Sequence, residues 1–159
     1  MDKEAVQSFT ARVTQASKSE LVVILYDMIL TELKEARGAY ETGDMVAFDK
    51  GVKQAQRYVN EMISTLDFHY GMSYDLLQLY LFVNKLIVTA VIRQNPDSLG
   101  HAESILNKLL VGFEGVSRTD TSGPVMHNTQ QLYAGLTYGK GKLNETYIDP
   151  DDRNRGFIA

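Results

Sequence analysis

Apolar residues recur at steps of three and four along most of the chain, which is the period of a helix that buries one face. Four such segments, each about 20 residues or about 30 Å of helix, are separated by short connections. Short connections make neighbouring helices run antiparallel. The pattern therefore predicts an all-α fold, an antiparallel up-down-up-down four-helix bundle with helices at about residues 17–40, 44–67, 73–93 and 96–115.

Polar residues and glycine mark where these helices begin and end. Ser17 and Glu20 have the spacing of a capping box, in which each side chain accepts a free backbone N–H of the first turn. Gly43 suits the left-handed conformation that ends a helix. The other expected signals are Asp44 and Ser73 as N-caps of the second and third helices, and Pro96 at the first position of the fourth.

The first and third helices are more apolar than one buried stripe requires. In the first helix the core stripe is Val22, Leu25, Ile29, Leu33, Ala36 and Tyr40, which leaves Leu21, Ile24 and Met28 on a second face. In the third helix the second face carries Leu77, Leu81, Val88 and Val91. Either a tail of the chain covers these spare faces, or they form a groove for an amphipathic helix of another protein. The pattern alone leaves both readings open.

The distribution of apolar residues, glycine and tyrosine divides the chain into three parts. Residues 1–16 form an N-terminal arm and residues 17–117 the bundle. Residues 118–159 form a tail rich in glycine and tyrosine, partly disordered or packed on the bundle, with a short helical turn expected around 128–136. The tail is the part of the chain expected to cover the spare faces if no partner does.

Composition narrows the class of protein. The 159 residues carry a net charge of −4, which argues against a nucleic-acid binder or a protein drawn to anionic membranes. There is no cysteine, and the N-terminus lacks the layout of a signal peptide. The most apolar stretch, Leu76–Ile92, contains Gln78, Asn84 and Lys85, so no membrane insertion is expected. We therefore expect a cytoplasmic protein.

Candidate chemistry is scarce in this sequence. A di-metal centre in a bundle needs Glu-x-x-His pairs, and none of His69, His101 and His127 has a glutamate three residues before it. We expect no metal site, no cofactor and no catalytic residue, and so no enzyme. Asp27 lies inside an apolar run, where it is either a catalytic carboxylate or, as we favour, a carboxylate at the bundle edge bonded to a loop or a partner.

The first helix resembles the opening motif of the FliS family of flagellar export chaperones. In that family a Thr-Ala-Ser-Pro-Glu start leads into an apolar run ending Leu-Tyr-Asp, and here Ala16-Ser17 precede Leu21-Val22-Val23-Ile24-Leu25-Tyr26-Asp27. Later helices are similar to the family pattern at Ala55-Gln56, Val59, Glu61, Met62, Leu66, Asp67, Leu79-Tyr80, Phe82, Leu86, Ala90, Asn95, Asp97, Ile105, Leu106 and Leu109. The resemblance covers about residues 13–113. Lys18 stands where the family favours proline and Met28 where it favours glycine, which marks a divergent member.

The resemblance implies a function as well as a fold. A protein of this family binds the disordered C-terminal segment of flagellin in the cytoplasm, prevents its premature polymerisation and helps to deliver it to the flagellar export apparatus. Two exposed apolar grooves would suit such a client without any catalytic group. Tyr26 and Asp27 are motif positions whose role could be structural.

We expect the client to contact the spare faces of the first and third helices. The candidate partner-binding residues are Leu21, Ile24, Met28, Leu77, Leu81, Val88 and Val91, each of which could equally be ordinary core. The alternative function is a structural or adaptor bundle that uses the same faces for homodimerisation. Either a monomer or a homodimer is compatible with the sequence.

Overall fold

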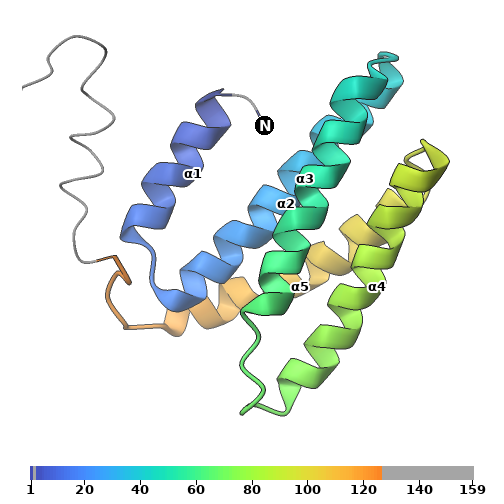
Figure 1. Cartoon of the computed structure of the whole chain (residues 1–159). Helices are drawn as coiled ribbons and strands as arrows, with labels where there is room; N and C mark the ends of the chain where they lie inside the picture. The colour runs from blue at the N-terminus through green and yellow to red at the C-terminus, as the bar shows by residue number, and fades with distance from the viewer. Residues whose placement is uncertain (2, 127–159) are drawn as a thin grey trace, which may run out of the picture. The chain divides into compact units, whose positions relative to one another are not determined.

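The computed structural model describes residues 1 and 3–126, and all regular structure in them is helical (Figure 1). The prediction of an all-α fold is therefore confirmed. The short helical turn expected around residues 128–136, like the rest of the tail from residue 127, lies outside the described residues. The helices are α1 (Lys3–Gln15), α2 (Lys18–Glu41), α3 (Met45–Ser64), α4 (Met72–Arg93) and α5 (Leu99–Thr119).

The first turn of α2 is closed as its sequence predicts. The Ser17 hydroxyl accepts the backbone N–H of Glu20, and the Glu20 carboxylate accepts the N–H of Ser17 at 2.7 Å. At the other end, Gly43 has a φ of 79°, a conformation that is costly for other residues. Asp44 then caps α3 by accepting the N–H of Ala47 at 2.9 Å. Local signals were sufficient at these three positions.

Two predicted helix starts are wrong. Ser73 does not cap α4, which begins one residue earlier; it is buried, and its hydroxyl donates to the carbonyl of Asp67 to close the α3–α4 connection. Pro96 is not the first residue of the last helix either. It lies in a turn in which the Asn95 side chain accepts the N–H of Asp97 at 2.7 Å, and α5 begins only at Leu99.

Helices α2 to α5 pack side by side around one core, and successive helices run in opposite directions (Figure 1). The core is apolar, with its largest fully buried side chains drawn from all four helices: Tyr26, Ile29, Leu33, Phe48, Val52, Val59, Tyr80, Val83, Ile87, Leu99 and Leu106. Close approach of α2 and α3 explains Gly51 inside α3. A Cβ at that position would lie 3.1 Å from the Ala36 Cβ and 3.3 Å from the Glu32 carbonyl oxygen.

One polar contact crosses this core. The hydroxyls of Tyr26 on α2 and Tyr80 on α4 lie 2.6 Å apart, and both side chains are buried. Burial raises the pKa of each phenol above its ordinary value of 10.0, so both remain neutral and share a hydrogen bond. Tyr26 also stacks against Phe113 of α5, with ring centroids 5.5 Å apart. The motif tyrosine thus links three helices of the core.

The segment before residue 17 is also helical, which the apolar pattern did not predict. Helix α1 contacts α2 and lies on the side of the molecule away from α4 (Figure 1). An isolated helix of 13 residues is only marginally stable in water, so α1 depends on its contact with α2. The fold therefore contains a bundle and one added helix whose stability comes from docking.

Candidate functional site

The spare face of α2 is covered by α1. Val23 and Ile24 are buried, with Ile24 only 4% exposed, although neither belongs to the main core cluster. Leu21 and Met28 on the same helix are half-buried. A hollow of about 360 Å³ lined by Arg12, Gln15, Ala16, Glu20, Val23, Ile24 and Ser117 adjoins the covered face. The contact between α1 and α2 is also much less extensive than that between α2 and α3.

An ion pair joins α1 to the motif aspartate of α2. The guanidinium of Arg12 lies 2.7 Å from the carboxylate of Asp27, and it also lies over the ring of Phe9 at 5.5 Å. At the other end of α1, the α-amino group of Met1 lies 3.3 Å from the carboxylate of Glu32. Asp27 therefore lies at the bundle edge, but it bonds a helix of the same chain and not the loop or partner that the sequence interpretation favoured.

The segment after α5 returns to the connection between α1 and α2. Ser19 donates its hydroxyl proton to Asp120, whose carboxylate also accepts the hydroxyl and, at 2.8 Å, the N–H of Ser122. These hydrogen bonds hold the pKa of Asp120 well below its ordinary value of 3.8, and the bond from the Ser122 hydroxyl contributes most. Further on, Val125 donates its N–H to the carbonyl of Ala16 at 3.0 Å. The end of α5 is thereby fastened beside the start of α2.

The second face of α4 is open. Leu81 is 51% exposed and Ile92 74% exposed, and Tyr74 on the same side of the helix is also exposed. Leu77 and Val88 are half-buried, whereas Val91 packs against the core. Of the candidate residues on α4, the structure thus places Leu77, Leu81 and Val88 along the open surface and Val91 at the core edge.

Exposed aromatic residues extend this surface onto the connection that precedes α4. The rings of Phe68 and Tyr74 contact each other with centroids 5.3 Å apart, and Tyr70 and Met72 between them are exposed. Aromatic residues and methionine are enriched in protein–protein interfaces relative to the rest of the surface. Sequence reasoning missed this cluster, although Phe68, Tyr70, Met72 and Tyr74 follow one another at every second position of the sequence.

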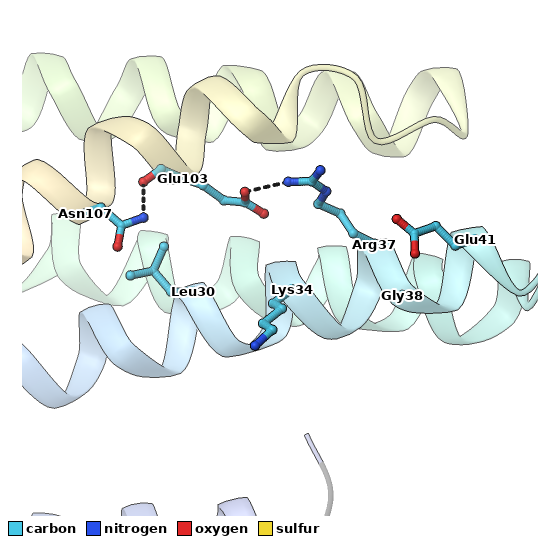
Figure 2. A pocket seen from close by; sticks show the side chains of 7 residues that line it. All are labelled: Leu30, Lys34, Arg37, Gly38, Glu41, Glu103 and Asn107. Carbon is cyan, nitrogen blue, oxygen red and sulfur yellow. Dashed lines mark hydrogen bonds and ion pairs between the residues drawn. The ribbon is translucent and has the colours of Figure 1, made fainter.

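A groove between α2 and α5 is of a different kind (Figure 2). It has a volume of about 420 Å³ and is lined by Leu30, Lys34, Arg37, Gly38, Glu41, Glu103 and Asn107. An ion pair of 2.7 Å between Arg37 and Glu103 crosses it, and Asn107 donates to the Glu103 carbonyl (Figure 2). Arg37 and Glu103 therefore pair across the two helices. Apart from Leu30 and Gly38, the residues that line this groove are charged or carry an amide.

The described residues show no arrangement for metal chemistry. Within residues 1 and 3–126, no three His, Cys, Asp or Glu side chains gather closely enough to hold an ion. His69 bonds only its neighbour Asp67 on the surface. By length and composition α4 could cross a membrane, but Tyr80, Val83, Ile87 and Ala90 on one of its faces lie in the core, and a core helix passes the same test.

Comparison with known protein families shows to which family the chain belongs. Residues 1–120 match the family model described as "Flagellar protein FliS". The chain belongs to the FliS family. FliS proteins are cytoplasmic flagellin export chaperones without enzymatic activity, so the chain is not an enzyme. No curated protein matches the chain.

As a FliS protein, the chain uses its two motif residues for structure. Tyr26 bonds Tyr80 inside the core, and Asp27 holds Arg12 of α1. The seven candidate contact residues are not equally accessible, because Ile24 is buried on α2, which α1 contacts, whereas Leu81 is exposed on α4. Their part in binding flagellin stays a prediction.

Proposed function

We propose that this FliS protein binds the disordered C-terminal segment of flagellin through the apolar faces of α2 and α4. In doing so it prevents premature polymerisation of flagellin and helps to present it to the export apparatus. The observation that supports this most directly is the open face of α4, on which apolar side chains such as Leu81 and Ile92 are exposed. An apolar surface of this kind on a protein with no catalytic role favours binding of a partner.

The length of the open face suits a client that folds on binding. A disordered segment loses conformational entropy when it binds, so it needs a large apolar contact to remain bound. The exposed positions of α4 run from Tyr74 to Ile92, which spans about 27 Å at 1.5 Å per residue. An amphipathic helix of the client with about the same length would cover them.

The α2 face offers a second contact only when α1 moves. Ile24 and Val23 are buried beneath α1, and α1 is a short helix with a limited contact to α2. A client that reaches Ile24 must therefore compete with α1 for the same apolar side chains. We propose that the client binds the open α4 face directly and the α2 face in exchange for α1.

Titration calorimetry with the C-terminal segment of flagellin from the same organism tests the proposal. The full chain should bind the segment, and Leu81→Glu should weaken binding at least tenfold because it places a charge in the apolar contact. Val46→Glu is the matched control, since Val46 is 81% exposed at the start of α3 and outside both faces. Absence of binding by the unmodified chain would refute the proposed function.

A further inference from the structure

The exposed side of α4 carries one positive charge among its apolar residues. Five residues follow one another along this side at steps of three, four and seven: Tyr74, Leu77, Leu81, Val88 and Ile92. We call this row the α4 stripe. Lys85 follows Leu81 by four residues and precedes Val88 by three, and Asn84 has the complementary spacing, so these two residues share the gap in the row. Lys85 is the charged one of the pair and lies close to the middle of the row.

Lys85 has no ionic partner within residues 1 and 3–126. Its side chain is exposed, and the two other charged residues of α4, Asp75 and Arg93, each lie about a third of a turn away from Leu81 around the helix. The stripe therefore presents a single cation and no carboxylate. A lysine stem also contributes apolar surface while its ammonium group stays in water, so Lys85 does not interrupt the apolar contact.

We propose that Lys85 is a specificity-determining residue, which selects a client helix with an aspartate or glutamate near the middle of its apolar face. This inference rests on the proposed function, because it concerns the same surface of α4. A helix laid along the stripe would cover Lys85 and remove part of its water. An ammonium group left unpaired in such an interface opposes binding, whereas a carboxylate opposite it offsets that cost and fixes the register of the helix.

The same charge disfavours a second copy of the chain as the occupant. In a symmetric dimer two α4 stripes would pair antiparallel about the midpoint between Tyr74 and Ile92. Each Lys85 would then lie within about one helical turn of the other along the axis. No carboxylate of either stripe could separate the two ammonium groups, so the pairing would bring like charges together. Charge complementarity thus favours an acidic helix over self-association.

Charge reversal on both sides of the contact tests this inference. The probe is the C-terminal flagellin segment, with each of its aspartates and glutamates replaced by lysine in turn. Lys85→Glu should weaken binding of the unaltered segment about tenfold, and Lys85→Gln about threefold. One acid-to-lysine variant of the segment should bind Lys85→Glu within about threefold of the original affinity, while binding the unmodified chain more weakly. Lys108→Glu changes the net charge equally at an exposed position of α5 and should alter affinity less than twofold.

The outcomes separate this inference from the function on which it rests. If the unmodified chain does not bind the segment at all, the proposed function fails. If it binds, but Lys85→Glu behaves like Lys108→Glu, or no segment variant restores binding, the role of Lys85 is refuted and the function stands. Sedimentation across concentration gives a further check. A dimer of the unmodified chain that Leu81→Glu dissociates would show that a second copy occupies the stripe, which also overturns the inference.

Discussion

Helices α2 and α4 have the same surplus of apolar residues in their sequences, but their second faces have different surroundings. On α2, Ile24 is 4% exposed because α1 lies over it. On α4, Leu81 is 51% exposed and no described residue covers it to a similar extent. The second faces of α2 and α4 have similar sequence patterns, but the first is covered and the second is open.

The difference lies in what precedes each helix in the chain. Two residues, Ala16 and Ser17, connect α1 to α2, so a covering helix is available locally at little cost in loop closure. The connection before α4 instead carries exposed aromatic residues, Phe68 and Tyr70, which enlarge the apolar surface. A client can therefore bind α4 without displacing any segment of residues 3–126, whereas on α2 it must compete with α1.

Replacing an apolar residue by glutamate should change the free energy of unfolding very differently at the two faces. Ile24→Glu removes a buried apolar side chain and buries a carboxylate, and should lower the free energy of unfolding by about 2–4 kcal/mol. Leu81→Glu, at an exposed position, should change it by less than about 0.5 kcal/mol. Urea unfolding followed by circular dichroism measures both values.

Displacement of α1 gives this experiment a second readout. If Ile24→Glu releases α1 instead of burying the charge, the loss of stability will be smaller, but limited proteolysis will cut residues 3–15 faster than in the unmodified chain. Equal stability and equal cleavage for Ile24→Glu and Leu81→Glu would contradict the distinction between a covered and an open face.

Smaller losses of stability are expected from the hydrogen bond that joins α2 to α4 inside the core. Tyr26→Phe leaves the buried Tyr80 hydroxyl without its partner, and Tyr80→Phe does the same to Tyr26. Each single variant should lose about 1–2 kcal/mol of stability, and the double variant should lose less than the sum, because it leaves no orphaned hydroxyl. Thermal or urea unfolding of the three variants measures this. Strictly additive losses would show that the two hydroxyls do not depend on each other.

The sequence predicted those features of the fold that depend on neighbouring residues. The cap of α2 needs only Ser17 and Glu20, three residues apart, and the end of α2 needs only Gly43. Ser73 shows the limit of such signals. It has the residue type of an N-cap, but its hydroxyl bonds the Asp67 carbonyl six residues earlier, so closing the α3–α4 connection takes the place of capping α4.

The covering helix could not be predicted for a related reason. The apolar residues of α1, chiefly Val6, Phe9 and Val13, are too few to indicate a helix without the contact that stabilises them. The partner of Asp27, Arg12, lies 15 residues away, and no local pattern connects the two. Which spare face is open and which is covered is likewise a property of packing. The candidate residues could be named from the sequence, but their accessibility could not.

The smallest expected effect concerns the ion pair that joins α1 to α2. Both side chains are partly exposed, Arg12 by 42% and Asp27 by 30%, so water and salt weaken their attraction. Arg12→Ala, Asp27→Ala and the double variant should yield a coupling of about 0.5 kcal/mol or less in a double-mutant cycle. Because this pair lies only between α1 and α2, hydrogen exchange in residues 3–15 is the suitable measurement, and exchange in α4 should not change. If the single variants accelerate exchange in α4 as much as in α1, the two faces are coupled, and by reciprocity a client that stabilises α4 would also stabilise the docking of α1.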